Sequence, residues 1–237
     1  MLAIVAPMAT ELSGIRRAIR DPEGRGIAFS LTGVGAARTR ASIQRVAECE
    51  PEAIIMVGFC GGADTGLRVG DLHVASAYHS VGAAPSDAIF ADPDLSASII
   101  AAARQQCNRV IRTGSSATVD VVAGTAAKLA AHEATGAASV NMEDYWAANA
   151  ACDVGIPFAS IRAVLDTAGE DLPDWISENG ESAARTIGRL VSHPRRVPGL
   201  IRIARQVMIA RRNLTCCVVG VIDALGSPRR NLSAAPR

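Results

Sequence analysis

The chain has 237 residues, of which 49% are hydrophobic and 20% are charged. This balance excludes intrinsic disorder as the main state, and the length suits one large domain or two small ones. Aromatic residues make up only 3% of the sequence, which argues against a surface that stacks nucleic-acid bases.

Charge is distributed unevenly along the chain. Residues 185–237 hold eleven arginines and a single acid, Asp223, whereas residues 1–184 hold the other 22 acids. A basic tail of this kind is a candidate for binding anionic lipid, nucleic acid or a second subunit. Its apolar stretch Leu214–Ile222 is far shorter than the ~20 residues of a membrane-spanning helix.

Cysteine and histidine usage points to a reducing compartment and to no metal site. The six cysteines contain no Cys-x-x-Cys pair, and we expect no secretory signal, so the sequence predicts a cytoplasmic protein with free thiols. The four histidines show no ligand spacing with one another or with cysteine, so no metal is expected.

The body of the chain alternates between predicted strands and helices. An apolar run over Met1–Pro7 predicts a buried strand, and Thr10 is expected to cap a helix from Glu11 to about Arg20. Further strands are predicted over 27–31, 53–57, 72–77 and 158–165, with helices from 38 to about 49, over 95–106, and from 143 to 152. Residues 110–113 and 119–122 are expected to flank a polar loop. This order predicts an α/β fold, a single domain with a central mixed β-sheet flanked by helices.

The tail is predicted to differ from the body. Residues 193–198 contain two prolines that interrupt the chain, and Leu200–Leu214 has the spacing of an amphipathic helix. Two interpretations stay open: a helix packed on the body or on a second subunit, or a surface helix that lies among lipid headgroups. We therefore divide the chain into a catalytic body, residues 1–192, and a basic amphipathic C-terminal extension, residues 193–237.

Candidate functional residues follow several predicted strands, because active sites of open α/β sheets form at the carboxyl ends of strands. Glu11 follows the first strand, where an acid also stabilises a helix start. Two predicted glycine-rich turns, around Gly35 and Gly58, either bring backbone N–H groups close to an anion or serve only as tight turns. The first turn lacks the third glycine of the dinucleotide fingerprint, which disfavours a nicotinamide-binding enzyme.

Two later segments carry acids. Glu143 follows Met142 at a predicted helix start, where a carboxylate can accept both hydroxyls of a ribose or simply stabilise the helix. Asp166 ends an apolar strand four residues after Arg162. Burial there would raise the pKa of Asp166 and make it a proton donor. The alternative for Arg162 is a salt bridge with some other acid.

In this order and spacing, the segments resemble the purine and uridine phosphorylase superfamily, particularly the bacterial nucleosidases that act on methylthioadenosine and adenosylhomocysteine. The likeness runs from Met1 to about Ala168 and rests on Ala6–Glu11, Gly33–Gly35, Gly58–Gly62, Val69–Asp71, Val140–Glu143 and Arg162–Ala168. The tail, from Gly188 through Leu214, is similar to the hopanoid-associated branch, which is thought to release adenine from adenosylhopane and leave ribosylhopane.

The resemblance implies cleavage of an N-glycosidic bond through an oxocarbenium-like transition state. It makes Asp166 the general acid at the purine and Glu11 the residue that orients or activates water. It assigns Glu143 to the ribose hydroxyls, with Met142 packed against the sugar. The implied nucleophile or phosphate contacts are Gly35, Arg38, Gly58 and Arg162, and the implied purine-flanking residues are Val119, Asp120 and Val121.

Two departures from the family pattern bear on the reaction. Phe59 and Leu165 stand where relatives place small hydroxyl residues, which removes donors for phosphate or water and favours hydrolysis of an apolar substrate. Arg38 keeps phosphorolysis open, with phosphate as co-substrate; no cofactor is implied.

The leading prediction is therefore release of adenine from adenosylhopane, in hopanoid lipid biosynthesis. A soluble methylthioadenosine/adenosylhomocysteine nucleosidase or purine nucleoside phosphorylase is one alternative, and a non-catalytic nucleoside-binding protein is another. The expected partners are a purine nucleoside, lipid-linked in the leading prediction, and further copies of the chain in a homo-oligomer. No nucleic acid is expected. The C-terminal helix would hold the protein on the inner face of the membrane.

Overall fold

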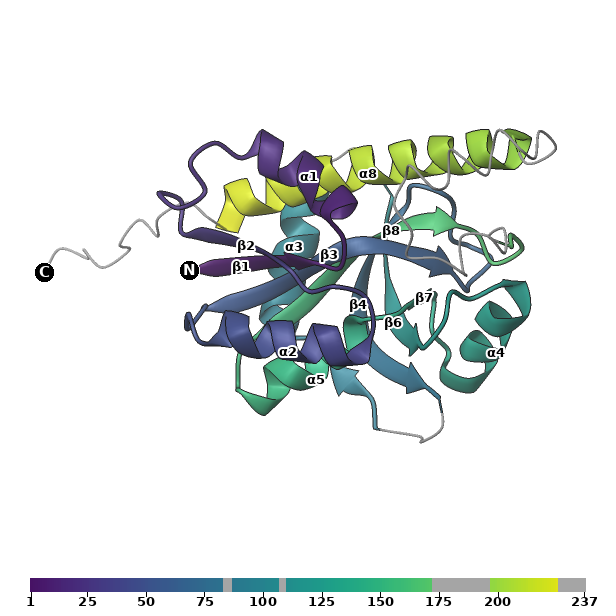
Figure 1. Cartoon of the computed structure of the whole chain (residues 1–237), viewed down its shortest axis with the longest axis horizontal. Helices are drawn as coiled ribbons and strands as arrows, with labels where there is room; N and C mark the ends of the chain where they lie inside the picture. The colour runs from purple at the N-terminus through teal and green to yellow at the C-terminus, as the bar shows by residue number, and fades with distance from the viewer. Residues whose placement is uncertain (83–86, 107–109, 172–196, 226–237) are drawn as a thin grey trace, which may run out of the picture.

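Eight strands and the helices around them make up the described part of the chain. The computed structural model describes residues 1–82, 87–106, 110–171 and 197–225. The strands are β1 (Leu2–Ala6), β2 (Ile27–Leu31), β3 (Ala53–Gly62), β4 (Leu72–Val81), β5 (Ile89–Phe90), β6 (Ile111–Val119), β7 (Ser139–Asn141) and β8 (Phe158–Asp166). The helices are α1 (Ala9–Ala18), α2 (Ala36–Ala47), α3 (Pro93–Gln106), α4 (Thr125–Thr135), α5 (Asp144–Asp153) and α8 (Val197–Leu225), arranged as Figure 1 shows.

The strands form one mixed sheet that closes on itself. Its order is β2-β1-β3-β7-β6-β4-β5, and β8 pairs with both β3 and β4. β3 runs parallel to β8 but antiparallel to β7, so β3, β7, β6, β4 and β8 form a closed ring of paired strands. Because β7 runs against β3, the residues that follow β7 return toward the middle of β3. The predicted α/β class with a mixed sheet is confirmed.

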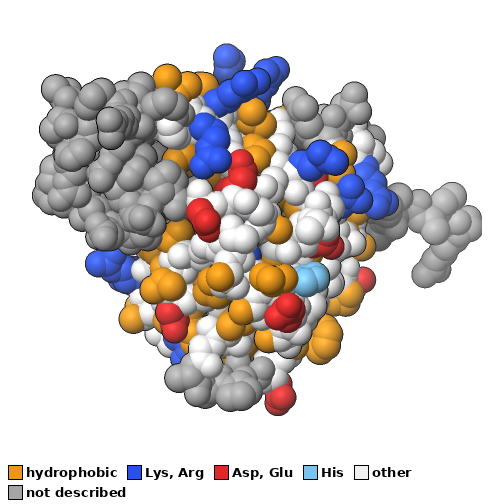
Figure 2. Space-filling model, turned by 90° about the vertical axis from the view of Figure 1, so that its right-hand side faces the viewer, with side chains coloured by type: hydrophobic (Ala, Val, Ile, Leu, Met, Phe, Trp, Pro, Cys, Tyr) orange, Lys and Arg blue, Asp and Glu red, His pale blue; other side chains and the backbone are white. Residues whose placement is uncertain are grey.

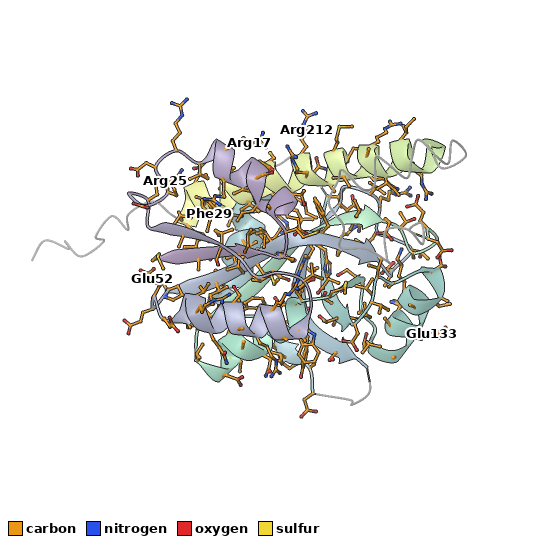
Figure 3. The ribbon with its side chains drawn as sticks, in the orientation of Figure 1. Arg17, Arg25, Phe29, Glu52, Glu133 and Arg212 are labelled. Atoms are coloured by element: carbon orange, nitrogen blue, oxygen red, sulfur yellow. The ribbon has the colours of Figure 1, made fainter. Side chains whose placement is uncertain are left out.

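Alternation along the strands separates two apolar faces, since successive side chains of a strand point to opposite sides. Ile4 and Ala6 of β1 pack with the helices α1, α3 and α8 on one side. Ala3 and Val5 pack with α2 and α5 on the other. Phe29 of β2 lies against the first of these clusters, on the side of the sheet that carries α1 and α8 (Figure 3). A third cluster, under α4, covers the end of the sheet at β6 and β7.

Helix α8 is part of the core. It packs against α1, α3 and β8, and its residues Ala210, Leu214, Cys217, Val218, Val221 and Ile222 are fully buried in the first cluster. Gly14 of α1 faces Thr215 of α8 with no room for a Cβ, so the two helices approach closely. Arg25 and Asp223 form an ion pair at 2.7 Å across the far end of α8.

The predicted C-terminal helix is therefore present, but it is longer than expected: it ends at Leu225 and not at Leu214. Packing on the body, one of the two interpretations left open, describes the inner face of α8. The expected boundary between residues 192 and 193 lies outside the described residues. No helix in the described ranges combines the length and the apolar character that crossing a membrane would need.

Three local predictions were wrong. Gly58–Gly62 is not a turn, because it forms the second half of β3. The expected polar loop between residues 113 and 119 belongs to β6, whose Ser116 and Thr118 are buried. Thr10 does not cap α1: Met8 is the N-cap, and the Glu11 side chain reaches back to its backbone N–H.

The packing of α8 generates the first prediction. We expect Leu214→Ala to lower the free energy of unfolding by about 2–5 kcal/mol, because it leaves a cavity between α8 and the sheet. Met208→Ala, on the same helix but 65% exposed, should change it by less than about 0.5 kcal/mol. Urea denaturation of both variants measures the difference. Equal effects would mean that α8 does not share the core of the body.

Candidate active site

A buried ion pair joins β8 to the start of α5. Alternation on β8 turns Ala159, Ile161 and Ala163 toward the first core cluster and leaves Ser160 and Arg162 on the opposite face. Arg162 donates to Asp144 Oδ1 from Nε at 3.0 Å and from Nη2 at 2.6 Å. Its side chain is 1% exposed and that of Asp144 is 0% exposed, so both charges depend on this pairing.

Polar side chains from neighbouring strands hold Asp144 in place. Asp144 Oδ2 accepts hydrogen bonds from Asn141 Nδ2 at 2.9 Å, Ser160 Oγ at 3.1 Å and Ser116 Oγ at 3.4 Å. Asn141 Oδ1 in turn accepts the backbone N–H groups of Glu143 and Asp144 at 2.9 and 2.8 Å. Asn141 thus satisfies the first free donors of α5, and the helix start favours the two acids that stand there.

Glu11 reaches the same ion pair from α1. Its carboxylate accepts the backbone N–H of Met8 at 2.9 Å through Oε2 and that of Phe59 at 2.7 Å through Oε1. The Phe59 carbonyl accepts Arg162 Nη1 at 3.2 Å. A Cβ on Gly58 would lie 2.7 Å from Glu11 Oε1 and closer still to Arg162 Nη1, so this position of β3 needs glycine.

Glu143 completes a cluster of three carboxylates around one guanidinium. Its Oε2 lies 3.4 Å from Arg162 Nη2, and the backbone N–H groups of Met142 and Gly35 lie near its carboxylate and act to lower its pKa. Gly35 has φ +89°, a conformation that favours glycine, and it directs its N–H at this acid. The structure therefore brings together five predicted residues: Glu11, Gly35, Gly58, Glu143 and Arg162.

Burial sets the protonation of these acids. It raises the pKa of Glu11 to about 7, against the opposing effect of Arg162 and of the two backbone hydrogen bonds. Burial also raises the pKa of Glu143, although Arg162 again opposes the shift. With Glu11 and Glu143 2% and 5% exposed, the site presents at neutral pH one carboxyl group that readily gains or loses a proton.

Asp166, the last residue of β8, lies beside a later residue of β3 and belongs to a second group of charges. β8 has an irregularity at Leu165, so Asp166, and not Leu165, pairs with Gly61. Such bulges redirect side chains and are frequent beside active sites. The Asp166 carboxylate, 2% exposed, forms an ion pair with Lys128 of α4. Burial raises the pKa of Asp166, and Lys128 opposes the shift.

The two groups share β3 as their base. Gly58 underlies Glu11 and Arg162, and Gly61 underlies Asp166 and Lys128. Three residues of strand separate them by roughly 10 Å. The Cys60 thiol lies between them. Its pKa is raised to about 12 by burial, and the charges of Arg162, Asp144 and Asp166 also act on it.

The remaining predicted residues lie around these groups or outside them. Met142 is half-buried, and Arg38 is exposed with no carboxylate partner among the residues that the structure describes. Val119 packs in the core cluster under α4, whereas Asp120 and Val121 are exposed. Phe59 and Leu165 pack against the first core cluster, so their side chains do not give the site an apolar lining.

Sequence reasoning missed Lys128, Asn141 and the structural role of Asp144. α4 was not predicted, although its lysine is the only one in a chain with 23 arginines, a signal that was available. The sequence alone gives Asp144 no role, because its partner Arg162 lies 18 residues away. Within the described ranges, no group of three His, Cys, Asp or Glu side chains is placed to hold a metal ion.

Comparisons with known proteins agree with this geometry. The family model described as "Phosphorylase superfamily" matches residues 10–193. A methylthioadenosine/adenosylhomocysteine nucleosidase from Colwellia psychrerythraea, solved with adenine, has the same fold with a TM-score of 0.74 and 17% identity, over 94% of this chain and 95% of that one. The corresponding enzyme of Neisseria meningitidis, in complex with methylthio-immucillin-A, gives 0.73 and 18%, over 94% and 99%.

A futalosine hydrolase from Helicobacter pylori is similar as well, with a TM-score of 0.72 and 16% identity over 94% of this chain and 97% of that one. No curated protein sequence matches the chain. At identities this low, the TM-scores establish a common fold and no more.

The ion pair of Arg162 generates the second prediction. Asp144→Asn keeps the shape of the side chain but leaves Arg162 without its main counter-charge, so we expect a loss of about 3–5 kcal/mol in the free energy of unfolding. Ser160→Ala removes one of several hydrogen bonds to the same charged carboxylate and should cost about 1.5–3 kcal/mol. Urea denaturation compares the two. A cost for Asp144→Asn no larger than that for Ser160→Ala would contradict the role given to the pair.

Proposed function

The chain belongs to the phosphorylase superfamily, and on that premise we propose that it hydrolyses the N-glycosidic bond of a purine nucleoside. The observation that carries the proposal is the placement of two groups of buried acids against β3. Glu11 and Glu143 surround Arg162 over Gly58, and Asp166 stands over Gly61. Cleavage of this bond makes the sugar positive and moves electrons onto the base, so it needs acids at both ends of the substrate.

The Arg162 group would hold the ribose and the water. Glu143 lies against Arg162 and the Gly35 N–H, which fixes its carboxylate for two vicinal hydroxyl donors. Glu11 is the base for the attacking water. Its pKa of about 7 is close to the pH at which a general base works best. Two backbone N–H groups orient its carboxylate without supplying a full counter-charge.

The charges of this group favour water over phosphate as the nucleophile. Arg162 is the one cation in the group, and Asp144 takes two of its N–H donors while Glu143 takes a third contact. The carboxylates outnumber the guanidinium, so a phosphate dianion would meet net negative charge in a buried, weakly screened site. Arg38, the other candidate phosphate ligand, is an exposed residue of α2 whose stem lies against Gly33.

Asp166 is the general acid of the proposal. Burial favours its protonated form. A protonated carboxyl group at the purine stabilises the leaving base as the glycosidic bond breaks, and such an acid contributes typically 10²–10⁴-fold to a rate.

For the substituent on the ribose we propose an apolar, lipid-type group, with adenosylhopane as the specific substrate. Two exposed apolar side chains lie beside the site acids: Met8 is 43% exposed and Val34 is 38% exposed. The Met8 N–H donates to Glu11, and Val34 directly precedes Gly35, whose N–H acts on Glu143. Exposed apolar side chains beside a polar site favour an apolar group on the part of the substrate that leaves the site.

The outer face of α8 supports delivery from a membrane surface. Ile201 and Met208 are 64% and 65% exposed, and Arg202, Arg205 and Arg212 are exposed on the same helix. Figure 2 shows basic side chains gathered at the top of the molecule, where α1 and α8 lie in Figure 1, above a surface rich in apolar side chains. An arginine-bearing amphipathic face of this kind suits anionic headgroups.

The third prediction concerns the products. Incubation with adenosine, methylthioadenosine or adenosylhopane should release adenine and a free ribosyl product, at a rate that added phosphate leaves unchanged. Chromatography with mass detection distinguishes this product from a ribosyl 1-phosphate. Adenosylhopane in phosphatidylglycerol vesicles should give the highest kcat/KM of the three substrates.

Each other outcome of that assay would indicate a different function. A phosphorylated sugar would make the protein a phosphorylase, and a preference for methylthioadenosine would make it a nucleosidase for small substrates. Adenine binding with no turnover of any of the three nucleosides would make it a binding protein.

The fourth prediction concerns pH. Glu11 must be ionised to act as a base, so kcat should rise as the pH increases through about 7, the pKa of this group. Glu11→Gln should lower kcat by about 10²-fold or more and remove this rise. Asp166→Asn should also lower kcat, by about 10²–10⁴-fold, but should keep the rise. The pH–rate profiles of the three proteins test this, and a rise near pH 7 that survives in Glu11→Gln would assign it to another group.

A further inference from the structure

Lys128 stands out as a buried cation that the proposed reaction does not use. It is the only lysine of the chain, and its side chain is 1% exposed. A lysine is rarely buried without a charged partner, because removing an ammonium group from water is costly. Here the partner is Asp166, the general acid of the proposed reaction.

Every donor of the ammonium group has an acceptor. Lys128 Nζ donates to Asp166 Oδ2, to the Thr167 carbonyl at 2.9 Å and to the Glu170 carbonyl at 2.7 Å. Three acceptors around a compact ammonium suit lysine, whereas the planar guanidinium of arginine would not fit this arrangement. This geometry accounts for a lysine here in a chain whose other long cations are all arginines.

The aliphatic part of the Lys128 side chain also explains why residue 61 is a glycine. A Cβ on Gly61 would lie 3.1 Å from Lys128 Cε and 3.5 Å from Asp166 Oδ2. The lysine therefore crosses β3 at a position that has no side chain, and it approaches the acid from the side of α4.

Lys128 binds the turn that follows β8, residues 167–171. Contacts with both α8 and α4 hold this turn in place. The Glu170 carboxylate accepts the Thr167 N–H at 3.0 Å and contacts Gln206 and Arg202 of α8 at 3.2 and 3.4 Å. Asp171 accepts the Thr125 N–H at the start of α4 at 2.6 Å. A lysine fixed to this turn cannot follow Asp166 if the carboxylate moves.

We propose that Lys128 is a positioning residue for Asp166: it holds Oδ2 against the turn after β8 and leaves Oδ1 to the purine. The inference rests on the proposed function. Among the described residues no donor contacts Oδ1 within hydrogen-bonding distance. Restraining one oxygen orients the other, and a displacement of about 1 Å at a reacting group can cost 10²-fold in rate.

The charge of Lys128 gives this role a pH signature. The charged or titratable groups that act on Asp166 are Lys128 from α4, Glu170 from the turn and Arg202 from α8, with Cys60 beside it on β3. Lys128 lowers the pKa of Asp166. Removing the ammonium group raises that pKa, so the acid stays protonated to higher pH and the fall in rate on the alkaline side moves upward.

The experiment compares wild type, Lys128→Met and the control Asp171→Asn, which removes a nearby charge while its side-chain oxygen can still accept the Thr125 N–H. We expect Lys128→Met to lower kcat about 10²-fold, to change KM less, and to shift the alkaline fall in rate to higher pH. Asp171→Asn should keep both the rate and the profile. Unchanged kcat in Lys128→Met, or a loss of kcat with no shift in the profile, would overturn the inference.

A second measurement uses the wild-type protein and covers the case in which Lys128→Met fails to fold. Protein labelled with ¹⁵N-lysine has a single lysine side chain, so its ammonium signal reports on Lys128 alone. Titration with adenine should shift that signal, and the Asp166→Asn variant should shift it without ligand. A signal unmoved by saturating adenine would overturn the inference. Wild-type protein that releases no adenine from any nucleoside refutes the proposed function itself.

Discussion

The Arg162 guanidinium and its carboxylates impose the main constraint on this molecule. A buried cation must have a counter-charge, and Asp144 supplies it through two hydrogen bonds. Asp144 depends on Asn141, Ser116 and Ser160 for its remaining oxygen, which fixes β6, β7, β8 and α5 relative to one another. Glu11 and Glu143 then share a cation that is already neutralised. Their pKa values are raised, and that is what makes them chemically useful.

Strand β3 makes this crowding possible because it carries glycines where the charged side chains cross it. Glycine weakens a strand by its flexibility, yet at Gly58 any side chain would collide with Glu11 and Arg162. The alternating residues Ile55 and Val57 keep the same strand anchored in the first core cluster. The apolar half of β3 thus stabilises the fold, and the glycine-rich half leaves room for the charged side chains that cross it.

Local sequence patterns predicted much of the fold and part of the site. The apolar runs located β1, β2 and β8, and acids at helix starts located Glu11 and Glu143. The glycines of β3 were misread as a turn, since glycine marks both turns and close approaches. Ser116 and Thr118 suggested a loop because their polar partners, Asp144 and Asn141, come from distant segments. Lys128 was missed for the same reason: its pairing with Asp166 exists only after α4 has folded onto β3.

The charges along β3 form a gradient that matches the proposed reaction. Over Gly58 three carboxylates face one guanidinium, so this end is negative whenever Glu11 is ionised. Over Gly61 Asp166 is matched by Lys128, with Arg202 nearby, so this end is neutral or positive. Cleavage of a glycosidic bond makes the sugar positive and the base negative. Fixed charges that oppose each developing charge lower the barrier without having to reorganise. In the proposed hydrolysis, the carboxylate excess that repels phosphate is therefore also the feature that stabilises the cationic sugar.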